Sequence, residues 1–573
     1  MIKAPWLAHY GNVPEHLAYP DSTMYELLAV TAERFPDNTA YEFMDVKTSY
    51  SELITEIDEC AKALQSIGIK EEDRVTICLP NIPQAVVMFY AINRIGAMAN
   101  MIHPLSSEGE IEFYLKESKS VAAITLDAFY GKFAAVRNRT ELENIIVTSI
   151  RDRLKPVLSL LFQLTKGRKI KPIPKQDDVI FWAEFLAMGK HCHLPVHGGQ
   201  KGNDPAVILY SGGTSGTTKG ILLSNRNFNA LALQTAAMGE CVFPGHVMLA
   251  ILPIFHGFGL GVCIHTMLVH GCHCILIPTF NAKIFGELLK KKKPNYIAGV
   301  PTLYEALLRS DTLKGVDLRC LEGVFCGGDS LSIELKRKVD HFLREHGATV
   351  EIREGYGMTE SVTASCLTPM HNGKEGSIGI PFPDMYYKIV RPGTQDELDY
   401  GTDGEICVSG PTVMIGYLGN LKENAHTLQE HPDGRIWLHT GDMGMMDEDG
   451  FIYFRQRLKR MIISSGYSIY PSQLENVIDG HEAVLMSTVI GVDDPYKMQK
   501  VKAFVVLKPG ISPTDQVKKS IHEHCEKNIA KYAMPYEFEF RESLPKTLVG
   551  KVAYTVLEAE EREKESKKEK HIE

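Results

Sequence analysis

The sequence predicts an α/β fold, in which helices cover parallel sheets, followed by a smaller α+β unit. Strand-like apolar segments alternate with amphipathic helical segments over most of the 573 residues, and this alternation is typical of parallel βαβ units. From about residue 375 the turns become frequent and the strands shorten, which favours an antiparallel region. The length, with 44% hydrophobic and 23% charged residues, indicates several globular domains.

The alternation of strand and helix is clearest in the first half of the chain. Residues 73–80 predict a buried strand that ends at a proline, and residues 84–96 predict a helix that ends at a glycine. The same order continues at 97–104, 107–118, 120–125, 293–301, 302–310, 321–328 and 332–347. The later, shorter strands are expected at 376–383, 386–390, 404–410 and 435–454. The α+β unit should begin after residue 461 and end near 555, followed by a charged tail.

A long uncharged segment, residues 241–282, raises the question of a membrane span. It contains no Asp, Glu, Lys or Arg and exceeds the ~20 residues that a membrane helix needs. Prolines, glycines and five histidines interrupt it. We therefore interpret it as a strand–helix–strand passage through the core of a parallel sheet, because strands buried on both faces read as continuous apolar runs.

Charge and cysteine content argue against several classes of protein. The net charge of −9, without a large basic field, argues against a nucleic-acid partner. Residues 1–23 lack a basic stretch followed by an apolar run, so we expect no secretory signal and a cytoplasmic protein. The 12 cysteines form no repeating framework, which fits a reducing compartment. Cys272 and Cys274 are interpreted as buried thiols rather than metal ligands.

Residues 210–220 (YSGGTSGTTKG) contain four glycines, five Ser or Thr side chains and one lysine. They follow a predicted strand at 206–210, and α/β sheets place ligands at strand ends. Glycines let several backbone amides point into one concavity, while the hydroxyls add donors and the lysine adds positive charge. The segment therefore predicts a polyphosphate site. It is not the usual P-loop, because Thr218 precedes Lys219 and Gly220 follows it.

This segment resembles the phosphate loop of the adenylate-forming superfamily, which includes acyl-CoA synthetases, adenylation domains of peptide synthetases and luciferases. Thr218 stands where the family usually has a proline. Further stretches resemble family motifs in the same order: LPIFHGFG (252–259), CGGDSLS (326–332), EGYGMTE (354–360), TGD (440–442), RQRLKRMIISSGYSIYPSQLE (455–475) and LPKTLVGK (544–551). The resemblance covers residues 206–551, whereas residues 1–205 fit the fold without a diagnostic motif.

The resemblance implies two domains. An N-terminal adenylation domain, residues 1–458, would contain two doubly wound αβ subdomains and a small β-barrel-like subdomain. A small mobile α+β domain, residues 459–573, would follow a hinge at Lys459.

The resemblance also implies a nucleotide site. Asp442 would accept hydrogen bonds from both ribose hydroxyls, Tyr356 would stack on adenine, and Arg457 would contact ribose or phosphate. The predicted ATP and AMP site comprises Ser211, Gly212, Gly213, Thr214, Ser215, Gly216, Thr217, Lys219, Gly327, Gly328, Asp329, Glu354, Gly355, Tyr356, Gly357, Thr359, Asp442, Arg457 and Lys551.

The implied reaction joins a carboxylic acid to CoA in two steps. The carboxylate attacks the α-phosphate of ATP, which forms acyl-AMP and releases pyrophosphate, so catalysis depends on positioning and charge neutralisation. Lys551 would bridge the carboxylate and the α-phosphate, and Thr359 would bond the α-phosphate. Glu360 would hold Mg²⁺, and His256 belongs to the acid-pocket segment. These four residues are the predicted catalytic set.

The second step would transfer the acyl group to CoA after the small domain rotates. Residues Ser465, Gly466 and Tyr467 would then frame a tunnel for the pantetheine arm. A glycine fits such a position because a backbone close to a thin thiol arm leaves no room for a Cβ atom.

The predicted acyl pocket consists of Phe255, His256, Phe258, Gly259, Gly327 and Met358. These residues offer no obvious cation for an amino or dicarboxylic acid, so a medium- or long-chain fatty acid is favoured over an aryl or steroid acid. The sequence also fits an enzyme that loads a carrier-protein phosphopantetheine, or a non-catalytic nucleotide-binding module.

Residues 149–176 combine a leucine-rich stripe with many Lys and Arg residues. The segment resembles one in fatty acyl-CoA synthetases, and it fits either peripheral membrane contact or a helix that caps the N-terminal domain.

The resemblance to the family implies that the partners are the acid, ATP, Mg²⁺ and CoA, and no nucleic-acid partner is expected. A monomer and a homodimer both fit the sequence.

Overall fold

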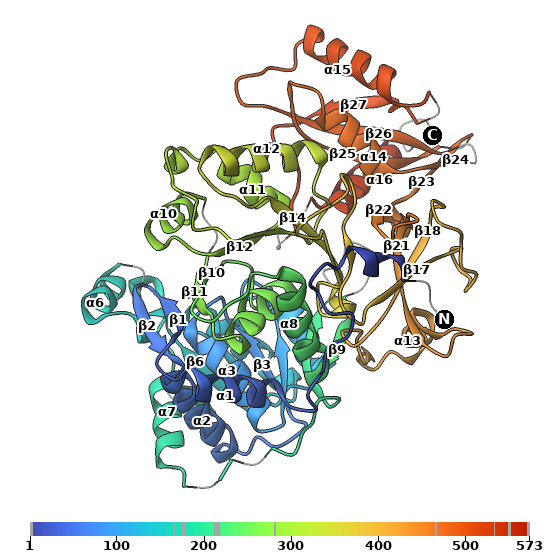
Figure 1. Cartoon of the computed structure of the whole chain (residues 1–573). Helices are drawn as coiled ribbons and strands as arrows, with labels where there is room; N and C mark the ends of the chain where they lie inside the picture. Colours follow the sequence, from blue (N-terminus) through green and yellow to red (C-terminus); the bar gives the residue numbers. More distant parts are fainter. Residues whose placement is uncertain are drawn as a thin grey trace.

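The computed structural model describes residues 4–569 except 166, 175–177, 194, 197, 211–217, 280–281, 465–466, 495, 532 and 548–551. Figure 1 shows two α/β lobes, a β-rich region beside them and a C-terminal unit at the top. The predicted fold class is confirmed.

The first large sheet has eight strands in the order β19-β9-β8-β4-β3-β5-β6-β7. The pairs from β8 to β7 are parallel, and β9 and β19 are added antiparallel at one edge. The strands are β3 (Arg74–Cys78), β4 (Met98–Met101), β5 (Ala122–Leu126), β6 (Asn144–Thr148), β7 (Val179–Phe181), β8 (Pro205–Tyr210), β9 (Gly220–Ser224) and β19 (Gly416–Tyr417). The helices of this part of the chain are α1 (Met24–Arg34), α2 (Tyr50–Ser66), α3 (Pro83–Arg94), α4 (Glu108–Ser118), α5 (Tyr130–Val136), α6 (Pro156–Leu164) and α7 (Trp182–His191).

The second large sheet has nine strands in the order β16-β15-β14-β13-β12-β10-β11-β1-β2. Its centre, from β14 to β1, is parallel. The strands are β1 (Thr39–Phe43), β2 (Val46–Ser49), β10 (Val247–Ala250), β11 (His273–Leu276), β12 (Tyr296–Gly299), β13 (Gly323–Cys326), β14 (Ile352–Tyr356), β15 (Cys366–Leu367) and β16 (Ile380–Pro381). The associated helices are α8 (Asn225–Gly239), α9 (Met267–Val269), α10 (Ala282–Lys292), α11 (Pro301–Leu308) and α12 (Ile333–Glu345).

The uncharged segment 241–282 passes through this second sheet. It forms β10, a π-helix η6 (Phe258–Thr266) that continues into α9, and then β11. The predicted strand–helix–strand passage is therefore confirmed, and Cys272 and Cys274 are buried. None of the helices in the described part of the chain combines the length and the apolar character of a membrane span.

The rest of the chain forms two smaller sheets of five strands each. The antiparallel region contains β17 (Tyr386–Val390), β18 (Gly404–Ser409), β20 (Leu428–Glu430), β21 (Ile436–Met446), β22 (Ile452–Arg457) and helix α13 (Leu421–Thr427). The C-terminal unit contains β23 (Ile462–Ser464), β24 (Tyr467–Ile469), β25 (Val484–Asp494), β26 (Met498–Leu507), β27 (Glu537–Phe540), α14 (Pro471–Asp479), α15 (Asp515–Asn528) and α16 (Tyr554–Glu569). Short 3₁₀ turns are η1 (Pro5–His9), η2 (Asp127–Phe129), η3 (Arg137–Arg139), η4 (Ile150–Arg153), η5 (Gly167–Lys169), η7 (Asp311–Leu313), η8 (Thr359–Ser361) and η9 (Leu458–Arg460).

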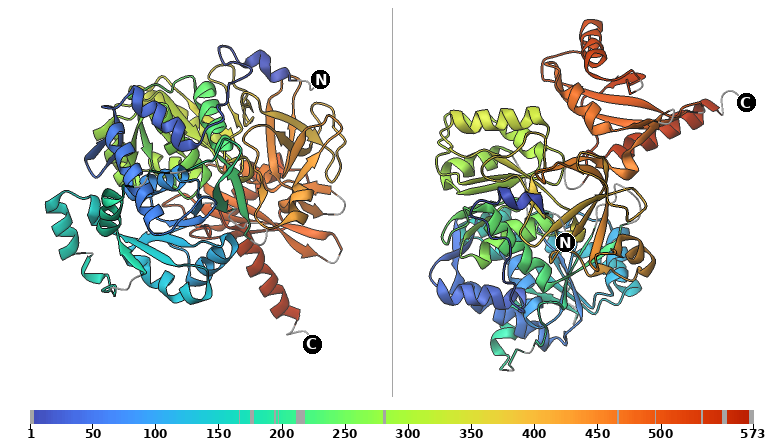
Figure 2. Two further views of the ribbon diagram at one scale, coloured as in Figure 1. Left: turned by 90° about the horizontal axis from the view of Figure 1, so that it is seen from below. Right: turned by 45° about the vertical axis from the view of Figure 1, so that its right-hand side comes forward.

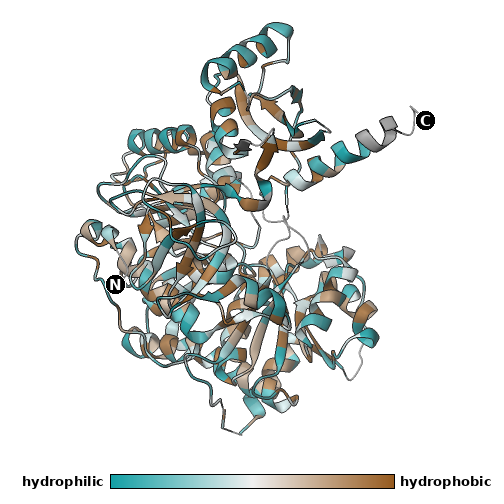
Figure 3. Ribbon diagram, turned by 90° about the vertical axis from the view of Figure 1, so that its right-hand side faces the viewer, coloured by the Kyte–Doolittle hydropathy of each residue, from teal (hydrophilic) through white to brown (hydrophobic). Residues whose placement is uncertain are grey.

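The C-terminal unit has a hydrophobic core of its own, in which Ile478, Val489, Val505 and Cys525 are buried together. The right-hand view of Figure 2 shows this unit above the rest of the chain, and Figure 3 shows α16 extending away from it. The backbone of Lys459, the predicted hinge, lies in η9 between the last strand of the antiparallel region and the first strand of this unit.

Helix α7 packs against α2 through a glycine. A Cβ atom on Gly189 would lie 1.9 Å from the carbonyl oxygen of Glu59. We expect Gly189→Ala to push the two helices apart and to lower the free energy of unfolding by roughly 1–3 kcal/mol, measured by urea denaturation. Gly131→Ala in α5 is the matched control, because nothing outside its own helix lies within 4 Å of the added atom. Equal losses in both variants would contradict this explanation.

Candidate active site

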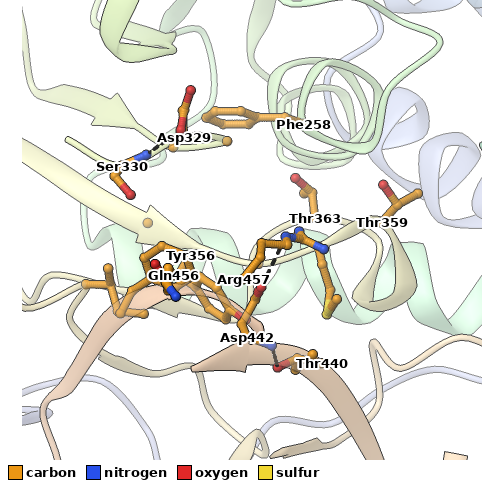
Figure 4. Close-up of a pocket in the computed structure, with 18 of the residues that line it drawn as sticks. Phe258, Asp329, Ser330, Tyr356, Thr359, Thr363, Thr440, Asp442, Gln456 and Arg457 are labelled. Carbon is orange, nitrogen blue, oxygen red and sulfur yellow. Dashed lines mark hydrogen bonds and ion pairs between the residues drawn. The ribbon is translucent and has the colours of Figure 1, made fainter. Parts of the chain in front are cut away.

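A cavity of about 1400 Å³ lies where the two large sheets, the antiparallel region and the C-terminal unit meet. The loop after β13 and the end of β14 form one side, and β21 and β22 form another. Thr547 and Val552 of the C-terminal unit also line the cavity. Figure 4 shows part of this site.

Strands β21 and β22 place Asp442 directly opposite Arg457 in their antiparallel register. The Nε atom of Arg457 lies 3.1 Å from Oδ1 of Asp442, whose side chain is only 2% exposed. The hydroxyl of Tyr356 donates to Oδ2 of Asp442 at 2.7 Å. A buried carboxylate needs such partners, and the charge of Asp442 raises the pKa of Arg457. The cluster is therefore a fixed acceptor at the cavity wall.

The backbone around Asp442 is held by a second carboxylate. Oε1 of Glu405 accepts a hydrogen bond from the N–H of Gly441 at 3.0 Å, and Oε2 lies 3.1 Å from Nδ1 of His439. The hydroxyl of Thr440 accepts from the N–H of Asp442 at 3.1 Å. These bonds fix the turn that presents Asp442.

The loop after β13 approaches β14 closely. A Cβ atom on Gly327 would lie 2.9 Å from the carbonyl oxygen of Gly355 and 3.5 Å from the ring of Phe258, so a larger residue would fill this part of the cavity. Glu354 accepts a hydrogen bond from the N–H of Leu331 at 3.1 Å. Burial raises the pKa of Glu354 to about 8, so this carboxyl is mostly protonated at neutral pH.

A second group of charged residues surrounds Glu360. The hydroxyl of Tyr417 donates to Oε1 of Glu360 at 3.0 Å, and Nζ of Lys219 lies 4.7 Å from the centre of the Tyr417 ring. Lys219 also forms an ion pair with Glu423 of α13. Burial, followed by the charge of Glu360, raises the pKa of Tyr417. Tyr417 therefore contacts both Lys219 of the glycine-rich segment and the buried carboxylate of Glu360.

The turn that carries Thr359 and Glu360 is strained at its end. Val362 has φ 64° and ψ −57°, a combination that is rare for a β-branched residue. The N–H of Thr363 donates to the carbonyl oxygen of Ser361 at 2.8 Å, which closes a γ-turn. The surrounding packing must hold this conformation, which fixes where the Thr359 side chain lies.

Apolar side chains form the remaining wall. They include Phe255, Phe258, Val262, Phe325, Met358, Leu367, Ile378 and Phe382. The ring of Phe255 packs on that of His103 at 4.5 Å between centroids, and Nδ1 of His256 accepts from the N–H of Phe258 at 3.3 Å. The cavity therefore combines an ionic part with an apolar part.

The structure brings most of the described predicted residues to this one cavity. The lining includes Lys219, Phe255, His256, Phe258, Gly327, Gly328, Asp329, Glu354, Gly355, Tyr356, Gly357, Met358, Thr359, Glu360, Asp442 and Arg457. Gly259 differs from the prediction, because it does not line the cavity and packs on backbone instead. A Cβ atom there would lie 2.1 Å from the carbonyl oxygen of Pro253.

Several predicted residues lie outside the described part of the chain. They are Ser211, Gly212, Gly213, Thr214, Ser215, Gly216, Thr217, Ser465, Gly466 and Lys551. For Lys459 and Tyr467 only the backbone is described. The flanking residues Tyr210, Thr218, Thr547 and Val552 all line the cavity, so both of the undescribed segments 211–217 and 548–551 begin and end beside residues that line it.

Sequence reasoning missed Tyr417 and Gln456. Tyr417 lies in a two-residue strand whose sequence reads as ordinary core. Gln456 lines the cavity with 1% of its surface exposed, and neither atom of its amide group has a hydrogen-bond partner among the described residues. A buried amide without a protein partner is costly, so Gln456 is available to a ligand. The surrounding RQRLKR sequence resembles a family motif, but the resemblance assigned roles only to Arg457 and Lys459 there.

Comparison with known proteins gives the family. Residues 28–418 match the model of the AMP-binding enzyme family, and residues 473–551 match that of the AMP-binding enzyme C-terminal domain. The chain belongs to the AMP-binding enzyme family. These matches confirm the predicted membership of the adenylate-forming superfamily. The predicted ligase class is confirmed by the relatives named as CoA ligases that are described next.

Individual relatives within the AMP-binding family match along the whole chain. A protein of Bacillus subtilis named long-chain-fatty-acid–CoA ligase is 35% identical over 566 residues, covering 98% of both chains. A protein of the same name from Salmonella typhimurium is 30% identical, covering 98% of this chain and 99% of its own. The crystal structure of an anthranilate CoA ligase in complex with anthranoyl-AMP has a TM-score of 0.81 at 23% identity, covering 97% of this chain and 99% of its own. At that identity the likeness supports the fold alone.

The link between Tyr417 and Glu360 can be tested by removing one hydroxyl. Tyr417→Phe keeps the ring beside Lys219 but removes the hydrogen bond to the carboxylate, which is worth roughly 1.5–3 kcal/mol for a charged acceptor. We expect the Kd for ATP with Mg²⁺, measured by calorimetry, to rise about tenfold. Tyr496→Phe is the control, because Tyr496 is 95% exposed. An unchanged Kd in Tyr417→Phe would show that the contact does not support nucleotide binding.

The buried carboxyl of Glu354 should make stability depend on pH. Its pKa is raised from 4.5 to about 8, so between these values the unfolded chain ionises while the folded chain stays protonated. Wild-type stability should therefore fall as pH rises through this window. Glu354→Gln, which keeps an acceptor for Leu331, should remove that part of the pH dependence, measured by urea unfolding near both ends of the window. The exposed Glu448→Gln should behave as wild type. Parallel pH profiles for wild type and Glu354→Gln would refute the raised pKa.

Proposed function

We propose that this protein activates a medium- or long-chain fatty acid as acyl-AMP, with release of pyrophosphate, and then transfers the acyl group to CoA. One observation carries the proposal: a single cavity joins an ionic part, built around Asp442 and Glu360, to an apolar part. Relatives named long-chain-fatty-acid–CoA ligase, which match along the full chain, support the choice of acid and acceptor.

In the first step, Asp442 would bind the ribose hydroxyls and Tyr356 would pack on adenine. Lys219 and Thr359 would contact the phosphates, and Arg457 would balance negative charge near the ribose. The apolar wall would hold the alkyl chain and exclude water. In that environment, fixed hydrogen-bond donors would stabilise the negative charge that develops on the phosphate oxygens. The ion pair between Lys219 and Glu423 would have to open when the polyphosphate binds.

Mg²⁺ fits the residues that are present. Glu360 offers a buried carboxylate, 9% exposed, beside the lysine of the phosphate loop, and Mg²⁺ prefers one or two carboxylates together with phosphate oxygens. When bound, the ion would neutralise charge on the phosphates. Tyr417 would hold the Glu360 carboxylate in place for it.

In the second step, we propose that residues 459–573 act as a mobile domain that turns about Lys459. Lys551 would serve only the first step, whereas Ser465, Gly466 and Tyr467 would frame the path of the CoA thiol. The separate hydrophobic core of the C-terminal unit supports rotation as one body. We further propose that the enzyme works in the cytoplasm and contacts membranes peripherally.

The reaction can be tested by mixing the protein with ATP, Mg²⁺ and a panel of fatty, aryl, steroid and amino acids. We expect pyrophosphate release with medium- or long-chain fatty acids, and an acyl-CoA product, identified by mass, only when CoA is added. Pyrophosphate release only with aryl or steroid acids would replace the proposed substrate. Nucleotide binding without turnover of any acid would contradict the enzymatic proposal.

The division of labour between the two steps predicts a selective defect in Lys551→Ala. We expect loss of adenylation by at least about a hundredfold, because a preorganised charge at the reacting phosphate is removed. Thioester formation from supplied acyl-AMP and CoA should change less than about threefold. Equal losses in both half-reactions would refute the division.

A further inference from the structure

Helix α6 presents its apolar residues to solvent. Of 22 exposed large apolar side chains in the described part of the chain, five belong to this nine-residue helix. They are Val157 at 71%, Leu158 at 43%, Leu160 at 59%, Leu161 at 53% and Leu164 at 48% exposed. None of the residues of α6 is buried. Such clustering of exposed apolar residues marks an interaction surface.

Four of the five exposed residues form one stripe. Val157, Leu160, Leu161 and Leu164 follow the i, i+3, i+4, i+7 spacing of one helix face. A helix that capped the N-terminal domain would turn this stripe inward. Instead, α6 lies at the outer edge of the lower lobe, beyond β1 and β2 (Figure 1), and all four residues of the stripe are exposed.

The base of the helix is fixed to the body of the protein. Arg153, in the turn before α6, donates two hydrogen bonds to the carboxylate of Glu56 in α2, at 2.6 and 2.9 Å. The side chain of Gln84 in α3 donates to the carbonyl oxygen of Ser149 at 3.2 Å. The helix is therefore held out from the surface by a partly buried anchor, and its exposure is a built feature of the fold.

The surrounding charge is strongly positive. Residues 149–176 contain eight Lys or Arg residues and one Asp, in a chain whose net charge is −9. Of these basic residues, Lys155, Arg168 and Lys171 are exposed at the two ends of α6. The single acid, Asp152, is engaged locally, because it accepts from the N–H of Ser149 at 2.9 Å. An apolar stripe between exposed cations matches the boundary of an anionic lipid layer, where acyl chains and phosphate groups are adjacent.

We propose that α6 is a membrane-docking element, whose apolar stripe inserts into the interface of an anionic bilayer while the flanking cations contact lipid phosphates. A second copy of the chain is the other occupant to consider. Two α6 surfaces facing each other would bring the two cationic segments together, and this repulsion favours the lipid. Docking through α6 does not depend on which acid the cavity holds.

The full-length protein can be tested by flotation with vesicles of phosphatidylcholine, either pure or with about a third phosphatidylglycerol. We expect binding to the anionic vesicles to be at least about tenfold stronger than to the neutral ones, and to weaken with salt. Changing Val157, Leu160, Leu161 and Leu164 together to Gln should weaken that binding about tenfold or more. The triple charge reversal Lys155→Glu, Arg168→Glu, Lys171→Glu should do the same.

The matched control is the triple reversal Lys518→Glu, Lys519→Glu, Lys527→Glu, which makes the same charge change at exposed positions of α15. It should retain vesicle binding, and all variants should keep the wild-type Kd for ATP, which reports correct folding. The proposal would be overturned if the wild-type protein fails to bind anionic vesicles, or if the α6 variants bind them as strongly as the wild type does. A Gln variant that changes only the monomer–dimer equilibrium in sedimentation would overturn it in favour of a second copy.

Discussion

The site depends on supplying hydrogen-bond donors to carboxylates that are largely buried. Asp442 is held by the guanidinium of Arg457 and the hydroxyl of Tyr356, and Glu360 by the hydroxyl of Tyr417. Without these donors, each carboxylate would be buried with unsatisfied acceptors, which is costly. At Glu354 burial is the dominant effect, and it raises the pKa to about 8.

Segments that are far apart in the sequence supply these carboxylates and their donors. Asp442 and Arg457 meet because β21 and β22 are neighbours in register, and Tyr356 reaches them from the end of β14 in another sheet. Tyr417 arrives on β19, which is paired with β9 directly after the glycine-rich loop. The same strand pairing therefore brings Lys219 and Tyr417 together. The chemistry thus rests on edges where sheets from separate parts of the chain adjoin.

The sequence predicted the elements well where apolar periodicity was strong, as in β3, α3 and the passage from β10 to β11. It predicted much of the site because contiguous motifs such as EGYGMTE carry several cavity residues at once. It missed Tyr417 because its partner Glu360 lies far away in the sequence. It missed Gln456 because that residue stands out only by its buried amide, which has no hydrogen-bond partner among the described residues. It also placed Gly259 in the pocket, although only the packing of η6 on Pro253 decides that position. Likewise, the outward orientation of α6 follows from its anchor on Glu56, which the leucine pattern alone does not reveal.

We propose that the glycine-rich loop and the segment around Lys551 act on one nucleotide in the cavity of Asp442. Hydrogen exchange tests it most directly, with the protein free and bound to a fatty-acyl adenylate analogue in which a sulfamoyl group replaces the phosphate. We expect slower exchange in peptides that span 206–224, 436–446 and 540–556, with little change in α15. Protection of only one of the first and last of these peptides, or of neither, would contradict it.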